Sequence, residues 1–420
     1  MGNSMQIPIV HCDVAIIGGG PAGLAAATQL KKQGIKSVIV IEREQDAGGI
    51  PRHCGHFAFG MREFYRVLTG PSYARKLVQR AIKFGVDIRV KHTVVKIEET
   101  HLQVTSPEGM SEIIAQRIII ATGVREKPRS ARAVSGERPL AVTSVGALQS
   151  MIYLKNNIPF VKPVIIGSEL VSFSSIWTCV VSGIRPVAML EETKRILARK
   201  PLNWMPRIFR IPLHYNTELV EIIGKDRVTG VRVKNKSGQI QEIICDGVVL
   251  SGQFLPESSL MRISGIDVDT HSGGPIIDQF GRCSNPKVFA TGNLLRPVET
   301  AGWCWREGTN LGDWVAKDLK IGLPPASKGI CISIKTPLIK LVVPQVIQLP
   351  YKSKDGMNQL QIRFSQPCKG QLVVRCDGEV IWQKNISSRA ERRILIPLKA
   401  FENITGHSQV ALDFQSFNSD

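Results

Sequence analysis

The feature that most constrains the fold is a glycine-rich turn in the stretch Asp13–Gly23. The apolar run Val14–Ile17 is typical of a buried parallel strand, and it leads directly into Gly18, Gly20 and Gly23. In this G-x-G-x-x-G spacing, the first glycine permits a tight turn and the second lets the backbone approach a pyrophosphate. The third glycine lets the following helix pack closely on the strand. The stretch therefore predicts a dinucleotide site.

Neighbouring features support this prediction. Pro21 stands in the first turn of an expected helix over Leu24–Leu30, where a missing N–H is tolerated. The helix N-terminus offers free N–H groups and a partial positive charge to phosphates. A second apolar strand, Ser37–Ile41, ends in Glu42, which lies 24 residues after Gly18. This distance is close to the roughly 20 residues expected for an acid that holds a ribose hydroxyl.

The pattern occurs a second time. Val164–Gly167 again joins an apolar strand to a glycine, and a helix is expected to run to about Val181. The strand Val187–Leu190 then ends in Glu191, again 24 residues after the glycine. We interpret the two stretches as an internal repeat, so that the chain contains two dinucleotide-binding units of the same design.

The second unit lacks the fingerprint of the first. Glu169 and Ser172 stand where the second and third glycines are expected. A carboxylate repels a pyrophosphate, and a side chain blocks close contact with the backbone. We interpret this unit as a vestigial nicotinamide site, and a site reached with altered geometry is the alternative.

The remaining pattern places the other elements. We expect a strand over Val86–Glu98, a strand and glycine turn over Asn285–Asn293, and a last helix over Thr309–Lys320. After about residue 331 the chain alternates apolar and polar residues, and Asp377-Gly378 is a strong hairpin signal, which together predict a small β-sandwich. The fold class is therefore α/β, with two Rossmann-like three-layer domains and a C-terminal all-β domain. The expected boundaries are 8–125 and 266–325 for the first dinucleotide domain, 126–265 for the second, and 331–420 for the β domain.

The cysteines and the hydropathy exclude several classes of protein. The nine cysteines of the 420 residues are never spaced C-x-x-C, which argues against a redox dithiol, an iron–sulfur cluster or a zinc site. No apolar run approaches the ~18 residues of a membrane span, and Met1–Ile9 lacks the layout of a signal peptide. We expect a cytoplasmic protein without a bound metal.

The charge is strongly positive. The net charge is +19 and the sequence pI is about 9.7, and the basic residues are spread along the chain, notably in Arg125–Arg138, Lys194–Arg210 and Arg389–Arg393. No aromatic-studded basic stripe or nucleic-acid-binding motif accompanies them, so we expect no nucleic acid partner. The charge favours docking to an acidic partner subunit or peripheral contact with the inner membrane. The third interpretation is that the charge only reflects a proteome whose proteins are basic in general.

The motifs together resemble a known family. Gly18–Gly23, Glu42, Ala121-Thr122-Gly123 and Phe289–Gly292 resemble the flavoproteins with two dinucleotide domains that are related to thioredoxin and glutathione reductases. The resemblance implies that the first unit binds FAD, that the late turn holds its ribityl chain, and that the second unit binds NAD(P)H. Asn293 replaces the usual Asp of that turn. The FAD-binding residues it implies are Gly18, Gly20, Pro21, Ala22, Gly23, Glu42, Arg43, Gly49, Ile50, Val95, Thr122, Gly123, Gly292 and Asn293.

Longer motifs point to a narrower branch. Gly48–Ala74, Glu169–Ser174 and Pro297–Gly308 look like the FAD-binding α subunits of dehydrogenases acting on opines, hydroxyproline, proline and, in hydrogen cyanide synthase, glycine. The same branch includes flavoproteins paired with a glycerol-3-phosphate dehydrogenase. The α subunits often end in a cysteine-rich [2Fe-2S] module, and this chain ends in a β domain without such cysteines. This difference favours the flavoproteins that are paired with a dehydrogenase over the α subunits.

Cys54 is the candidate catalytic residue, because in related reductases the loop with the reactive cysteines lies against the flavin. One interpretation is a reactive thiolate beside His53 and His56, whose positive charge would lower its pKa. The other is a loop whose side chains form hydrogen bonds around the flavin. Arg306 and Glu307 could form an ion pair at a helix start or contact the flavin. None of these residues is assigned as a catalytic base.

The resemblance implies an FAD-dependent oxidoreductase, the electron-transferring subunit of a dehydrogenase complex that oxidises an amino acid, an opine or glycerol 3-phosphate. Such a subunit would work with a second dehydrogenase or flavoprotein subunit. The alternatives are a self-sufficient NAD(P)H-dependent flavin oxidoreductase and a non-catalytic scaffold that carries FAD.

Overall fold

The computed structural model describes residues 7–198, 201–326, 329–352, 356–404 and 409–417. Most of the N-terminal stretch in which we expected no leader, residues 1–6, therefore lies outside the described residues. Contacts divide the chain into two compact units. The first unit comprises 1–49, 76–124 and 256–420, and the second comprises 50–75 and 125–255.

The first unit is built on a seven-stranded sheet with the order β3-β2-β1-β6-β5-β4, in which β18 also pairs with β6. Its strands are β1 (Ile9–Ile17), β2 (Val38–Glu42), β3 (Asp87–Val90), β4 (Thr93–Glu98), β5 (His101–Ser106), β6 (Gly109–Ile120) and β18 (Val288–Ala290). β1 runs parallel to β2 and β6, and β18 runs parallel to β6. The carboxyl ends of these strands therefore lie along one edge of the sheet.

Two helices of the first unit pack along each other, α1 (Pro21–Lys32) and α8 (Ala301–Ile321). Their approach is unusually close, because a Cβ atom added to Gly308 of α8 would lie 2.1 Å from the carbonyl oxygen of Ala22 in α1. The other helical segments assigned to this part of the chain are α3 (Gly70–Lys83, which straddles the boundary between the units), α7 (Ser259–Ile263) and the 3₁₀ turn η4 (Gly292–Leu294).

The second unit has a five-stranded sheet with the order β12-β11-β10-β16-β9 and a four-stranded sheet with the order β15-β14-β13-β8. The strands of these two sheets are β8 (Ser135–Gly136), β9 (Val142–Ser144), β10 (Pro163–Ile166), β11 (Ala188–Glu191), β12 (Leu213–Tyr215), β13 (Glu218–Ile223), β14 (Gly230–Lys234), β15 (Ile240–Ile244) and β16 (Gly247–Leu250). Two further strands, β7 (Val124–Glu126) and β17 (Phe254–Pro256), pair with each other. Each of them has one residue in the first unit, Val124 or Pro256. The helical segments of the second unit are η1 (Ile50–His53), α2 (Met61–Phe64), η2 (Arg129–Arg132), α4 (Val145–Lys155), α5 (Leu170–Val181), η3 (Leu202–Trp204) and α6 (Met205–Ile208).

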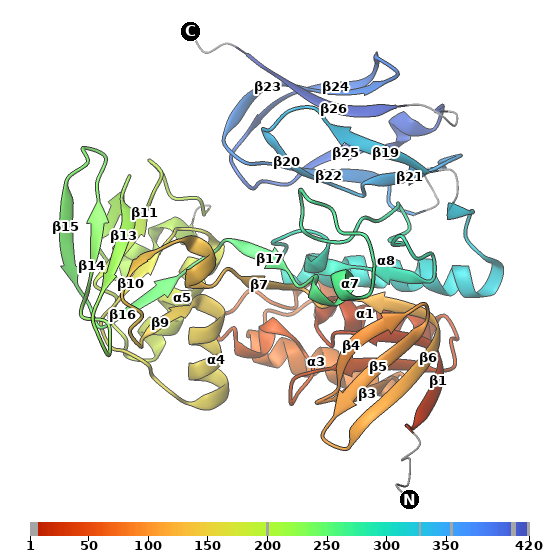
Figure 1. Ribbon diagram of the computed structural model, residues 1–420, viewed down its shortest axis with the longest axis horizontal. Helices are drawn as coiled ribbons and strands as arrows, with labels where there is room; N and C mark the ends of the chain where they lie inside the picture. The colour runs from red at the N-terminus through yellow and green to blue at the C-terminus, as the bar shows by residue number, and fades with distance from the viewer. Residues whose placement is uncertain (1–6, 199–200, 327–328, 353–355, 405–408, 418–420) are drawn as a thin grey trace, which may run out of the picture. The chain divides into compact units, whose positions relative to one another are not determined.

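The described residues between 329 and 417 form a C-terminal β region, drawn in blue in Figure 1, which belongs to the first unit. Two sheets, with the orders β21-β19-β26-β23-β24 and β20-β22-β25, enclose a common apolar core. Its elements are β19 (Gly329–Ile334), β20 (Ile339–Val343), β21 (Val346–Gln348), β22 (Gln359–Phe364), β23 (Cys368–Cys376), β24 (Glu379–Ser388), β25 (Ile394–Pro397), the 3₁₀ turn η6 (Leu398–Phe401) and β26 (Val410–Ser416). The predicted all-β character of this region is confirmed, and β23 and β24 pair as an antiparallel hairpin around Asp377-Gly378.

The α/β fold with two Rossmann-like sheets is confirmed, and two predicted elements differ from the structure. The single strand expected over Val86–Glu98 is two strands, because Lys91 adopts a left-handed conformation with a φ of 58° and turns the chain between β3 and β4. The helix expected over Thr309–Lys320 begins eight residues earlier, at Ala301. No helix among the described residues is long and apolar enough to cross a membrane.

Candidate dinucleotide-binding site

Three turns of the first unit meet at the carboxyl edge of its parallel strands. The N–H of Gly18, after β1, donates to the carbonyl of Ile41 in β2 at 2.9 Å. The turn Ala121-Thr122-Gly123 follows β6, and the turn Thr291-Gly292-Asn293 follows β18. In open parallel sheets, ligands bind at this edge, where the strand order reverses. The structure therefore brings the three predicted cofactor-binding turns to one place.

The glycines of the first turn have the space that a bound pyrophosphate requires. A Cβ atom on Gly18 would lie 2.5 Å from the Ala121 oxygen, and one on Gly23 would lie 2.0 Å from the Gly18 oxygen. These two glycines thus allow the turn and the helix to pack. Apart from its two chain neighbours, the only heavy atom of the described residues within 4 Å of a Cβ atom added to Gly20 is the Cα of Gly49, at 3.8 Å. The backbone at Gly20 is therefore open to a ligand, as the motif predicts.

The acid at the end of β2 is held in place by the backbone. Glu42 is buried, its Oε2 accepts from the N–H of Gly19 at 2.9 Å, and its Oε1 accepts from the N–H of Glu44 at 3.0 Å. A carboxylate oxygen has further acceptor capacity after one hydrogen bond, so Glu42 can still accept from a ribose hydroxyl. The residues present fit the adenosine half of a dinucleotide.

Asn293 has a role that an aspartate could not fill. Its Oδ1 accepts from the N–H of Glu299 at 2.6 Å, and its Nδ2 donates to the carbonyl of Glu299 at 3.2 Å. A carboxylate has no donor for the second bond. The amide thus ties the turn after β18 to the loop before α8, and this accounts for the departure from the usual Asp.

The other predicted site residues lie as follows. Pro21 is at the first helical position of α1, and Ala22 is buried. Thr122 donates from its Oγ1 to the carbonyl of Glu257 at 2.9 Å, while Gly49, Gly123 and Gly292 all have positive φ. Arg43 is exposed and lies 3.9 Å from the Glu44 carboxylate, Val95 is at an irregularity in β4, and Ile50 is an exposed residue of the second unit.

The second unit repeats this frame around Glu191. Glu191 is buried at the end of β11, as Glu42 is at the end of β2. Its Oε1 accepts from the N–H of Thr193 at 2.8 Å, and its other oxygen accepts from the hydroxyl of Ser168. Helix α5 begins just after Glu169, as α1 begins just after Gly20. The internal repeat is therefore present in three dimensions.

The side chain of Glu169 fills the space that remains open in the first unit. A Cβ atom added to Gly252, after β16, would lie 2.1 Å from its Oε1, and one added to Gly167 would lie 2.7 Å from its Oε2. The hydroxyl of Ser172 donates to the same carboxylate at 3.2 Å. Burial raises the pKa of Glu169, and the neighbouring charge of Glu191 adds to this effect. A carboxyl group thus lies beside the glycine turn of the second unit.

Cys54, in the second unit, has the environment of an unreactive thiol. Its Sγ lies 3.7 Å from Oε1 of Gln149 and 3.5 Å from the carbonyl of Ile50. Burial raises the pKa of Cys54 to about 12. Burial also lowers the pKa of His53 to about 4 and lowers that of His56, so neither ring carries the charge that would stabilise a thiolate at neutral pH. These surroundings argue against a reactive thiolate at Cys54.

This environment predicts that Cys54 resists alkylation. At pH 7.5 a thiol with a pKa near 12 is ionised in fewer than about one molecule in a thousand. We expect iodoacetamide to modify the exposed Cys331 of the native protein and to leave Cys54 unmodified, as measured by peptide mass spectrometry. Denatured protein, in which both thiols should react, is the control. Modification of both thiols at similar rates in the native protein would contradict the structural assignment.

The polar residues around the start of α8 form contacts that the sequence did not indicate. Glu307 pairs with Arg296, while the guanidinium of Arg306 lies 5.1 Å from the ring centre of Trp303. The ion pair considered between Arg306 and Glu307 is thus replaced by one with Arg296. Among the described residues, no group of three or more His, Cys, Asp or Glu side chains is arranged to hold a metal ion.

Comparisons with known proteins agree with this geometry. The profile of the pyridine nucleotide-disulphide oxidoreductase family matches residues 12–308. An opine oxidase subunit from Rhizobium meliloti is 23% identical over 67% of this chain and 58% of that protein, so the chain spans about three fifths of its length. Thioredoxin reductase of T. acidophilum superposes with a TM-score of 0.63 at 22% identity, over 74% of this chain and 99% of that one. L-proline dehydrogenase of P. horikoshii gives a TM-score of 0.55 at 18% identity, over 76% and 58%.

Proposed function

The chain belongs to the pyridine nucleotide-disulphide oxidoreductase family, and we propose that it is the electron-transferring FAD subunit of a dehydrogenase complex. The proposed substrates are an amino acid, an opine or glycerol 3-phosphate. The FAD-binding domain comprises 8–125 and 266–325, the degenerate nucleotide domain comprises 126–265, and the β domain comprises 331–420.

FAD would be held by the first unit. Open backbone at Gly20 and the N-terminus of α1 suit its pyrophosphate, the carboxylate of Glu42 suits the adenosine ribose, and the turn at Gly292 and Asn293 suits the ribityl chain. When bound, the flavin supplies the two-electron chemistry. The chain's own residues bind and orient it, and we assign no proton transfer to any of them.

The observation that carries the proposal is the position of the Glu169 carboxyl group. It lies where a second pyrophosphate would approach the turn at Gly167. Because like charges repel and the space is filled, this unit is unsuited to NAD(P)H. Electrons would then reach the flavin from a partner protein, and the similarity to a protein named as one subunit of an opine oxidase supports such an assembly.

The charge supports the same proposal. A chain with a net charge of +19 is suited to an acidic partner subunit. The proposed location is the cytoplasm, where the negatively charged surface of the inner membrane would also attract the chain.

Anaerobic mixing of the purified protein with NADH or NADPH tests the proposal. We expect the flavin absorbance near 450 nm to persist in the wild type, because Glu169 blocks the second unit. A Glu169→Gly variant removes the obstructing carboxylate and should be bleached at least about tenfold faster. Glu108→Gly, which replaces an exposed acid in the turn between β5 and β6 of the first unit, is the control. Rapid bleaching of the wild type would overturn the proposal.

A second candidate is a self-sufficient NAD(P)H-dependent oxidoreductase. The observation that favours it is the retained acid Glu191, which is buried at the end of its strand as Glu42 is, and which accepts hydrogen bonds from Ser168 and Thr193. Rapid bleaching of the wild type would support this candidate. A flavin that neither NAD(P)H nor substrate with partner reduces would point to a scaffold.

A further inference from the structure

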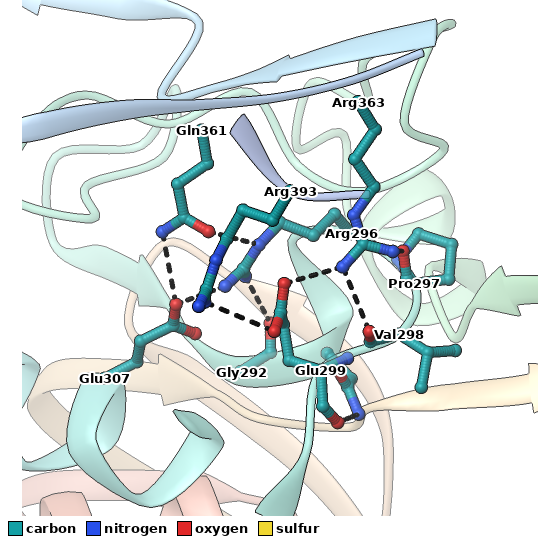
Figure 2. Close-up of polar contacts among 10 residues, drawn as sticks. Gly292, Arg296, Pro297, Val298, Glu299, Glu307, Gln361, Arg363 and Arg393 are labelled. Carbon is teal, nitrogen blue, oxygen red and sulfur yellow. Dashed lines mark hydrogen bonds and ion pairs between the residues drawn. The ribbon is translucent and has the colours of Figure 1, made fainter. Parts of the chain in front are cut away.

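A network of buried charges joins the C-terminal β region to the loop before α8, within the first unit (Figure 2). We call it the arginine network. It consists of Arg296, Glu299 and Glu307, from the loop and α8, together with Gln361, Arg363 and Arg393, from the C-terminal β region.

Arg363 of β22 makes the largest set of contacts to the loop. Its guanidinium donates to the carbonyl of Pro297, to the carbonyl of Val298 at 3.0 Å, and to the carboxylate of Glu299 at 2.6 Å. Arg363 and Glu299 are both buried, with 6% and 9% of their surface exposed. One side chain of the β region therefore holds three consecutive residues of the loop. A lysine would keep the positive charge but could not make all three contacts, because it lacks the planar fork of donors.

Gln361, two residues earlier on the same strand, bridges a second pair. Its Oε1 accepts from Nε of Arg296 at 3.0 Å, and its Nε2 donates to Glu307 at 3.3 Å. Arg296 also pairs with Glu307 and donates to the carbonyl of Gly292 at 3.3 Å. Since Gly292 belongs to the turn after β18, this second set of contacts reaches the turn that also contains Asn293.

The loop held by Arg363 connects directly to the dinucleotide site. The backbone N–H and carbonyl of Glu299 are both bound by Asn293, and α8 begins two residues after Glu299. Arg393 adds a second cation to the Glu299 carboxylate at 3.2 Å and lies 3.6 Å from the ring centre of Trp303 in the first turn of α8. A continuous chain of contacts thus runs from β22 through Glu299 to Asn293.

We propose that Arg363 and Gln361 are positioning residues of the flavin site, so that FAD affinity depends on the C-terminal β region. This inference rests on the proposed FAD binding by the first unit. Without Arg363, the Glu299 carboxylate keeps one ion pair within the described part of the chain, that with Arg393, and the loop loses the donor that fixes its carbonyls. The turn at Gly292 and Asn293 would then sample other conformations, which weakens binding because the turn must be ordered again at each binding event.

Titration of flavin-stripped protein with FAD, followed by flavin fluorescence, tests the inference. We expect Arg363→Met to raise the Kd for FAD at least about tenfold, because hydrogen bonds to charged groups are lost. Arg363→Lys should rescue part of the affinity, and Gln361→Ala should give a smaller increase of about threefold. Far-UV circular dichroism shows that each variant is folded. If Arg363→Met does not fold, the milder Gln361→Ala variant decides the question.

A matched control distinguishes positioning of the flavin-site turn from a general attachment of the C-terminal β region to the rest of the first unit. Gln279 exchanges two hydrogen bonds with the backbone of Gln348 in β21, at 2.9 and 2.8 Å, and so joins the same parts of the first unit elsewhere. Gln279→Ala should lower stability but keep the Kd within about twofold of wild type. A folded Arg363→Met protein with wild-type affinity, or an equal loss in Gln279→Ala, would overturn the inference. If the wild type takes up no FAD, the proposed function itself fails.

Discussion

A Gly20→Glu variant is expected to fold like the wild type and to purify without flavin. The second unit shows why the fold should survive, because Glu169 occupies the corresponding place with φ −72° and ψ 175°. Gly20 has φ −81° and ψ −175°, a conformation open to any residue. The introduced carboxylate would occupy the space for the pyrophosphate and repel it, which should raise the Kd for FAD at least about a hundredfold.

The flavin content of the purified variant, read from its visible spectrum, measures this effect. Gly20→Ala is the control, since its Cβ atom would meet only the Cα of Gly49 at an ordinary 3.8 Å. It should therefore fold, and it should bind FAD more weakly than the wild type, because its methyl group holds the pyrophosphate away from the backbone, but more tightly than Gly20→Glu, which also adds a negative charge. A yellow Gly20→Glu protein with wild-type affinity would show that the pyrophosphate does not approach Gly20, and it would remove the basis of the proposed cofactor site.

The parts of the fold that depend on neighbouring residues could be predicted from the sequence. Each strand–glycine–helix unit has its signals within about thirty residues of the chain. The local sequence is therefore enough to predict both units, the acids Glu42 and Glu191, and the loss of the glycine motif at Glu169. The structure adds where the side chain of Glu169 lies. That the Glu169 side chain lies against Gly252, 83 residues away, follows only from the pairing of β10 with β16.

The early start of α8 could not be predicted, because its glycines disfavour a helix by local propensity. Tertiary packing reverses this preference. A Cβ atom on Gly308 would lie 2.1 Å from the Ala22 oxygen, and one on Gly312 would lie 2.9 Å from the Ala26 oxygen. These residues are glycines because α1 lies against them. A local pattern cannot show this, since α1 is almost three hundred residues distant in the chain.

The arginine network was missed for a different reason. In β22, Leu360 and Ile362 alternate with Gln361 and Arg363, a pattern typical of a strand with one face in water. The polar face instead lies against the loop before α8, and Arg363 is buried there. Alternation alone does not distinguish a solvated face from a polar interface, because both require side chains that form hydrogen bonds.

Within this network, we expect Arg296→Met to have the largest effect on stability. Arg296 is 1% exposed, and its guanidinium neutralises the Glu307 carboxylate, whose other oxygen, Oε2, is buried without a hydrogen-bond partner among the described residues. Removing one member of a buried ion pair leaves an uncompensated charge, which costs about 3–5 kcal/mol. The free energy of unfolding, from urea denaturation followed by circular dichroism, should fall by this amount.

The double variant Arg296→Met/Glu307→Leu provides the decisive comparison. Replacing both members of a buried pair by apolar side chains of similar volume is often neutral in stability, because the desolvation cost of the charges is removed with their attraction. The double variant should therefore recover most of the stability lost in the single one. Lys340→Met, which breaks the exposed pair with Glu391, should cost at most about 1 kcal/mol. If the double variant is no more stable than Arg296→Met, the loss comes instead from the bonds of Arg296 to Gln361 and Gly292, and its main role is to hold the turn after β18.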